Sequence, residues 1–207
     1  MIGRIFKGWA LILSLLLPLS PPPALGNSKQ WPIARNPIKT AGSGRKVTVT
    51  LAPAVEQALR RHFPGFHVAD SGDFSPYLAP SMMEGRPKLF VPFACVGDFD
   101  GNGLPDVALM LKNGHRQWLF IALHQTHRGT FRPYRLEPRP WSHDQLIDES
   151  GRVHVFLEAL SLRKYFPEAL HLKHDDRRDG IHEVWAGEAS GLFYFRGGRY
   201  RYLQTSD

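Results

Sequence analysis

The stretch VALMLKNGHRQWLFIALH, from Val107 to His124, decides the fold. Two runs of apolar, β-branched and aromatic residues, 107–112 and 116–124, flank the dipeptide Asn113-Gly114. Asn-Gly is the strongest short hairpin signal, because both central residues of a type I′ turn need positive φ. The stretch therefore predicts two antiparallel strands joined by a tight turn.

The chain on either side of this hairpin predicts further strands. They are expected, between Gly, Pro and polar turns, at 89–96, 131–136, 153–157, 181–186, 192–196 and 199–203. Pro133 favours an edge position for its strand. Upstream, Pro53 and apolar residues spaced by three and four predict a short amphipathic helix over 52–62. Because hairpins without intervening helices imply an antiparallel sheet, the expected fold class is α+β, with the helix packed on one face of the sheet.

The first 26 residues have the pattern of a secretory signal peptide. A basic start is followed by the nine apolar-rich residues of 9–17, a proline cluster, and small residues at Ala24 and Gly26. A membrane span needs about twenty apolar residues, so the mature chain is expected to contain no transmembrane segment. The expected location is secreted or periplasmic.

The basic charge of the chain is concentrated after this segment. The 207 residues include 26 lysines and arginines against 19 acids, a formal charge of +7. Residues 27–50 contain five of those basic residues, no acid, and several Pro and Gly, which indicates a flexible basic arm ahead of a single domain over 51–207. An anionic envelope polymer or glycan is a possible partner of such an arm. Export argues against nucleic acid, and a single cysteine, Cys95, excludes an internal disulfide and reads as a small buried hydrophobe.

A polar loop, Gly97 to Asp106 (GDFDGNGLPD), lies between two of the expected strands. Its oxygen-bearing side chains recur at alternate positions, which is the spacing by which a tight loop wraps a calcium ion with six to eight oxygens. Gly103 permits the sharp bend, and the loop is not an EF-hand because Leu109 stands where an EF-hand has Glu. The expected Ca²⁺ ligands are the side chains of Asp98, Asp100, Asn102 and Asp106 and the carbonyl of Leu104.

Electrostatics favour an ion in this loop over an empty turn. Unneutralised, its three carboxylates would repel one another by about 1 kcal/mol or more per close pair. With a dissociation constant of about 0.1 mM and external calcium at about 1 mM, a bound ion would stabilise the fold by about 1.4 kcal/mol. The ion is therefore expected to be structural.

The residues GDFDGNGLPDVALML resemble one copy of the FG-GAP or VCBS calcium-loop repeat, found in integrin-type β-propellers and in many bacterial surface proteins. The resemblance implies the same five ligands. The chain has one such copy, whereas a closed propeller needs at least about four blades, too many for the 207 − 26 = 181 residues that follow the signal peptide. A propeller is therefore excluded. Residues 180–207 are similar to the end of small exported bacterial proteins with one such loop.

Two histidine clusters are weaker metal candidates. His124 and His127 have HxxH spacing, and a late cluster could also collect Zn²⁺. The late cluster comprises His171, His174, Asp175, Asp176, Asp179 and His182. No GxSxG, HExxH, P-loop or GxGxxG motif occurs, so the sequence favours a non-enzymatic protein.

The expected function is an exported calcium-binding domain of the bacterial envelope, non-enzymatic, with a binding or accessory role. Two alternatives remain. One is a metal-dependent hydrolase that uses the late His/Asp cluster. The other is a glycan- or protein-binding module that uses the aromatic C-terminal hairpin, in which Phe193 and Phe195 should face opposite to Tyr194 while Tyr200 and Tyr202 alternate with arginine.

Overall fold

The computed structural model describes residues 36–43, 46–75, 90–114, 117–137, 147–185 and 189–206. The expected signal peptide and residues 27–35 of the expected arm lie outside this part of the chain. In chain order the elements are β1 (Ile38–Ser43), β2 (Lys46–Leu51), α1 (Pro53–His62), β3 (His67–Val68), the 3₁₀ helix η2 (Ser71–Asp73), β4 (Ala94–Gly97), β5 (Asp106–Asn113), β6 (Gln117–Gln125), β7 (Phe131–Leu136), β8 (Val155–Ser161), α3 (Leu162–Tyr165), β9 (Asp179–Trp185), β10 (Ser190–Arg196) and β11 (Arg199–Ser206).

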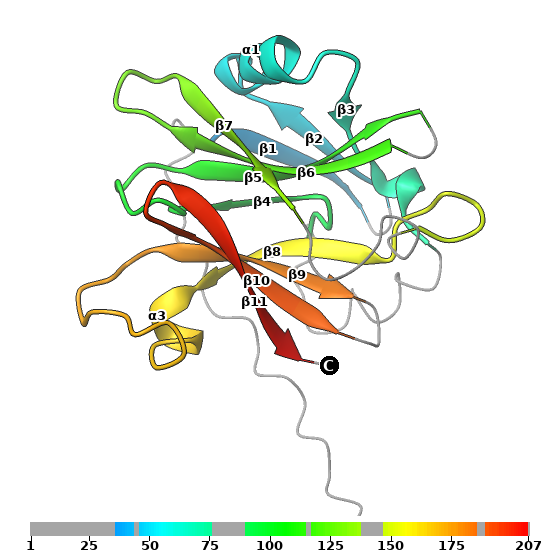
Figure 1. Ribbon diagram of the computed structural model, residues 1–207. Coiled ribbons are helices and arrows are strands. Elements are labelled where there is room, and N and C mark those ends of the chain that lie inside the picture. Colours follow the sequence, from blue (N-terminus) through cyan, green and yellow to red (C-terminus); the bar gives the residue numbers. More distant parts are fainter. Residues whose placement is uncertain are drawn as a thin grey trace, which may run out of the picture.

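The central sheet is built on the predicted hairpin. β5 pairs with β6 and β6 with β7, all antiparallel, while β3 and β4 share the other edge of β5. β7 is an edge strand, as its Pro133 predicted. Residues 106–111 of β5 are buried on both faces, because other layers cover the sheet above and below (Figure 1).

One covering layer is a second antiparallel sheet of order β11-β10-β9-β8. Figure 1 shows this sheet below the central one. The two share one apolar core, to which the central sheet contributes Leu109 and Ile121 and the second sheet Leu157, Ile181 and Phe193. Burial of this core is the main contribution to the stability of the fold.

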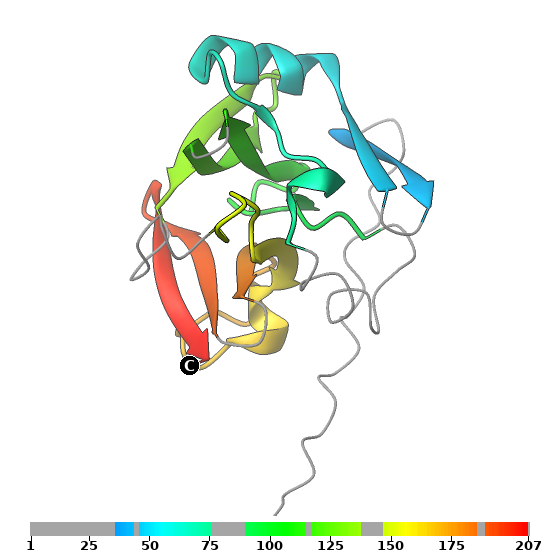
Figure 2. The same cartoon turned by 90° about the vertical axis from the view of Figure 1, so that its right-hand side faces the viewer.

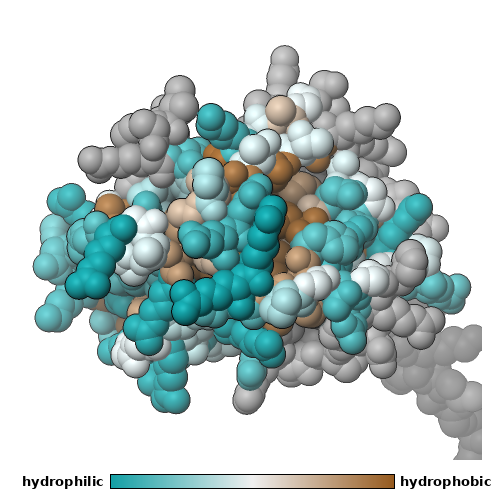
Figure 3. Space-filling view, turned by 90° about the horizontal axis from the view of Figure 1, so that it is seen from above, coloured by the Kyte–Doolittle hydropathy of each residue, from teal (hydrophilic) through white to brown (hydrophobic). Residues whose placement is uncertain are grey.

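The other covering layer consists of α1 and the β1-β2 hairpin (Figure 2). α1 buries Val55, Ala58 and Leu59 and contacts β7, while Glu56 and Arg60 on its outer side are exposed. Figure 3 views the molecule from this side, where hydrophilic residues dominate and apolar ones show between them. The expected α+β class, with a helix on one face of an antiparallel sheet, is confirmed, and the described residues form no closed barrel or propeller.

The expectation of a flexible arm over residues 27–50 is wrong for the second half of that range. Ile38 pairs with Leu51 in an antiparallel hairpin, and Ile38 and Val47 join the core. The alternation Val47-Thr-Val-Thr-Leu51 is a strand pattern, with its apolar side chains on one face. Residues 38–51 are therefore part of the fold.

Two local expectations also change. The strand expected over 89–96 begins only at Ala94, because Pro92 and Phe93 form a turn. In the central hairpin Asn113 pairs with Gln117, so three residues separate the strands instead of the two that a type I′ Asn-Gly turn would leave.

Candidate metal centre

The loop expected to bind calcium lies between two paired strands. β4 ends at Gly97 and β5 begins at Asp106, and these two residues face each other in the register. Gly97 has no room for a side chain, since an added Cβ would lie 2.6 Å from the Phe99 ring. Gly101 and Gly103 have φ of +84° and +80°, which other residues rarely adopt. The glycines of the motif thus set the path of the loop.

Asp98 closes the loop on itself. Its side chain is 3% exposed, and its Oδ1 accepts a hydrogen bond from the Gly101 N–H (2.9 Å) while Oδ2 accepts one from the Gly103 N–H (3.1 Å). Asp100 Oδ1 and Asn102 Oδ1 each accept from the N–H two residues further on, at 3.0 and 2.7 Å. Most side-chain oxygens of the motif therefore also hold the backbone of the loop.

Asp106 is a fully buried carboxylate. Its Oδ2 accepts from the Phe99 N–H at 2.9 Å, and its Oδ1 accepts from the Gln125 N–H at 2.7 Å, which ties the loop to β6. Burial, and then the nearby charge of Asp100, raise the pKa of Asp106 to about 8 despite these donors. Burial also raises the pKa of Asp100. Both groups would gain from a neutralising cation.

His124 on β6 completes the site. The register that pairs Val107 with Leu123 brings the next residue beside Asp106. His124 is 3% exposed, and its Nε2 lies 2.6 Å from the Tyr200 hydroxyl of the second sheet. The rings of Tyr134 and Phe195 pack against it, with centroids 4.4 and 4.6 Å away. Burial lowers the pKa of His124 to about 3, so its imidazole is neutral at physiological pH, the form that binds metals.

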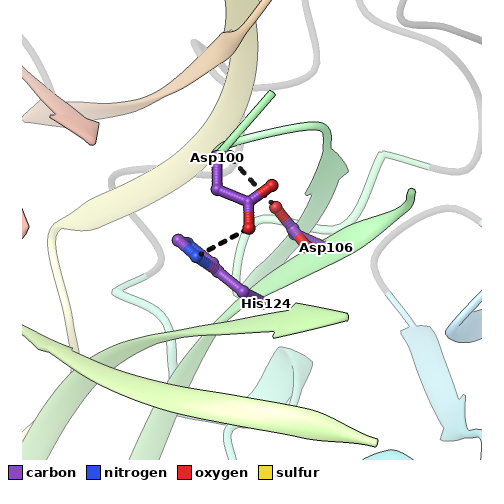
Figure 4. Close-up of side chains that lie close together, drawn as sticks. All are labelled: Asp100, Asp106 and His124. Carbon is purple, nitrogen blue, oxygen red and sulfur yellow. Dashed lines mark hydrogen bonds and ion pairs between the residues drawn. The ribbon is translucent and has the colours of Figure 1, made fainter. Parts of the chain in front are cut away.

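The acceptor groups of three residues converge at this point. Ligand atoms of Asp100, Asp106 and His124 all lie within 4.8 Å of one another. Figure 4 shows the three side chains pointing toward one another. The His124 Nδ1 is 3.5 Å from Asp100 Oδ2, and within the described part of the chain it is buried without a hydrogen bond. Carboxylates and imidazole facing one another in this way form a donor set suited to a divalent cation.

The structure groups the predicted calcium ligands differently from the sequence motif. It brings Asp100 and Asp106 together but leaves Asp98 outside the group, on the backbone N–H groups of the loop. Asn102 adjoins the group, since its Nδ2 donates to Asp100 Oδ2 (3.1 Å) and to the Gln125 carbonyl (2.8 Å). The sequence motif did not point to His124 as a partner of this loop.

The two histidine clusters are not assembled among the described residues. His127 lies exposed in the turn after β6, apart from the buried His124. In the late cluster, His182 bonds Glu158 at 2.8 Å, His174 bonds Arg163 at 2.9 Å, and Asp176 pairs with Arg178. These residues have separate partners and form no common metal-ligand group in the described segments.

Asp179, also from the late cluster, instead anchors the calcium-type loop to the second sheet. Its Oδ2 accepts from the Asp98 N–H, and its own N–H donates to the Asp98 carbonyl, both at 2.9 Å. The stem of the neighbouring Arg178 covers Gly101, where an added Cβ would lie 2.8 Å from Arg178 Cγ. The loop is therefore held by both sheets.

Cys95 is half-buried and packs against the main core, in agreement with its expected role as a small hydrophobe. Burial, together with the charges of Glu158 and Asp179, raises the pKa of its thiol well above the ordinary value. The thiol stays protonated and is a poor nucleophile.

Comparisons of the chain with protein-family models, with curated proteins and with solved structures each found no match. The likeness to an FG-GAP or VCBS repeat thus rests on the loop residues alone. Among the described residues, no helix has both the length and the apolar character that a membrane crossing requires.

Proposed function

We propose that the protein is an exported, non-enzymatic domain of the bacterial envelope that binds one divalent cation, Ca²⁺, at the loop 98–106. The observation that carries the proposal is the convergence of the Asp100 and Asp106 carboxylates on the unbonded Nδ1 of the buried His124. The two carboxylates, when both are ionised in a buried site, repel each other unless a cation or a proton lies between them. The export part of the proposal rests on the pattern of residues 1–26.

The chemistry of the donors favours calcium, with one qualification at His124. Oxygen atoms supply most of the acceptors, and calcium prefers oxygen. The imidazole of His124 extends the range of ions to those that accept nitrogen, such as Mn²⁺ and Zn²⁺. The cation would join the β4-β5 loop to β6, and through Asp179 this loop already contacts the second sheet. Its role is therefore structural.

Thermal unfolding of the mature chain tests this proposal. About 1 mM CaCl₂ should raise the melting temperature by about 4 °C over EDTA, as expected for an ion at about ten times its dissociation constant. Asp106→Asn should abolish the shift, because it removes a carboxylate from the centre, and His124→Gln should reduce it. The exposed Asp175→Asn is the matched control and should keep the full shift.

Two results would overturn the assignment. One is a wild-type melting temperature that no divalent cation changes. The other is a full calcium shift in Asp106→Asn. Mn²⁺ or Zn²⁺ could instead give a larger shift than Ca²⁺ at equal concentration, and His124→Gln could abolish that larger shift. This result would mean that the site binds a metal but that its ion is not calcium.

A further inference from the structure

A groove runs along the junction of the two sheets and adjoins the metal centre, because two of its lining residues, Tyr134 and Tyr200, contact His124. The end of β7, the edge strand of the central sheet, meets the start of β11, the edge strand of the second sheet (Figure 2). Between them is a cavity of about 580 Å³, within the range of about 300–1,000 Å³ usual for small-ligand sites. The two walls of this groove come from segments more than 50 residues apart in the sequence.

Positive charge dominates the groove. Arg135 on β7 and Arg199 and Arg201 on β11 line it and are exposed, against one acidic lining residue, Glu137, so the formal charge of the lining is 3 − 1 = +2. No carboxylate in the described part of the chain forms an ion pair with these three arginines. A guanidinium group binds a carboxylate through two parallel hydrogen bonds, so the groove is complementary to a carboxylate-bearing ligand.

Three tyrosine rings give the groove a firm aromatic surface. Tyr200 is held by His124, and its ring packs against Tyr134 with a centroid distance of 5.9 Å. Tyr202 packs against the buried Phe193 at 5.0 Å. The C–H face of a sugar ring packs on such fixed aromatic surfaces, which bind without losing much side-chain freedom.

From these two properties together we propose that the β7-β11 groove binds a short stretch of an acidic oligosaccharide, with sugar rings on the tyrosines and uronate carboxylates on the arginines. A nucleic-acid strand fits less well, because a strand-binding surface tracks the phosphates of about four or more nucleotides. The groove offers three cations, all of them lining a single cavity. The proposal does not require an ion in the metal centre, although His124 of that centre holds Tyr200 in place.

Calorimetric titration of the mature chain with a galacturonic acid tetramer tests the proposal. EDTA is present throughout, so that failure of the metal site cannot be mistaken for failure of the groove. The tetramer should bind, and its fully methyl-esterified form should bind at least about tenfold more weakly, because the ester keeps the sugar rings and removes the charge.

The variant that tests the residues is the double substitution Arg199→Gln and Arg201→Gln, which should weaken tetramer binding at least about tenfold. The matched control, Arg60→Gln with Arg61→Gln, removes two exposed arginines from α1 and should leave binding unchanged. The proposal is overturned if the tetramer gives no binding, if the ester binds equally well, if the β11 variant binds like wild type, or if a thymidine decamer binds more tightly than the tetramer.

Discussion

Glu183 places a carboxyl group inside the core. It lies on β9 between Ile181 and Trp185, both members of the main apolar cluster, and it is 0% exposed. Within the described part of the chain its oxygens make no hydrogen bond of standard geometry, and the Trp185 side chain beside it only partly offsets the effect of burial on its pKa. Burial raises the pKa of Glu183 to about 7, so the carboxyl holds a proton at pH values where an exposed glutamate has lost it.

This residue predicts a pH dependence of stability. Because the folded-state pKa is raised, the stabilising contribution is full below the unfolded pKa of about 4.5 and is lost as pH rises through about 7. Glu183→Gln cannot titrate, so the loss of unfolding free energy between pH 5 and pH 8 should be smaller in the variant, by up to about 3 kcal/mol. Urea unfolding of both proteins at the two pH values measures this. An equal pH dependence in both would contradict the assignment.

The sequence assigned two of the three converging residues to this site and named the third, His124, only as a weak candidate beside His127, for a physical reason. Asp100 and Asp106 belong to a local motif, whereas His124 reaches them through strand register. A two-residue Asn113-Gly114 turn would place Ile121 opposite Asp106, but the observed pairing of Asn113 with Gln117 shifts the partner strand by three residues and places His124 there. The length of the turn decides this register, and the Asn-Gly dipeptide alone does not fix that length.

At the scale of elements, the most regular segments were predicted best. The helix over 52–62 and the strand 131–136 match α1 and β7, because hydrophobic period and proline position both mark them. The β1-β2 hairpin was missed because its short strands lie in a segment rich in basic residues, Pro and Gly, and these features concealed the alternation in Lys46–Leu51. Composition averaged over a window hides a strand of six residues.

Val47 provides a test of that hairpin. Its side chain is 4% exposed and packs in the main core, so Val47→Ala should lower the free energy of unfolding by about 2 kcal/mol, through lost burial and a residual cavity. An exposed residue of the same strand gives the control, since Thr50→Ala should change the free energy of unfolding by less than about 0.5 kcal/mol. Chemical denaturation measures both. A neutral Val47→Ala would mean that this segment does not belong to the fold in solution.

At the scale of the whole molecule, the two sheets interact at more than one place. They share the apolar core, and the Leu157 N–H of the second sheet donates to the Pro92 carbonyl at 2.9 Å. The Asp98-Asp179 bonds and the His124-Tyr200 contact join them again. These links argue that the sheets form one cooperative unit.

Native-state hydrogen exchange tests this cooperativity. The amides of Ile121 in β6 and Ile181 in β9 lie on inner strands of different sheets, and both should exchange through global unfolding, with the same free energy and the same denaturant dependence. The amide of Asp175, in an exposed turn, should exchange far faster. A lower opening free energy for Ile181 than for Ile121 would indicate that the second sheet unfolds separately.

The free edges of the two sheets also bear on solubility. An exposed strand edge is a template on which another chain can add, and proteins oppose such growth with charged residues and proline on the edge strand. β11 carries Arg199 and Arg201 at alternate positions, and β7 carries Pro133, which has no N–H to offer. The arginines assigned above to a ligand therefore also repel the approach of a second copy, so the same positive charge that attracts an acidic partner protects the protein from aggregation.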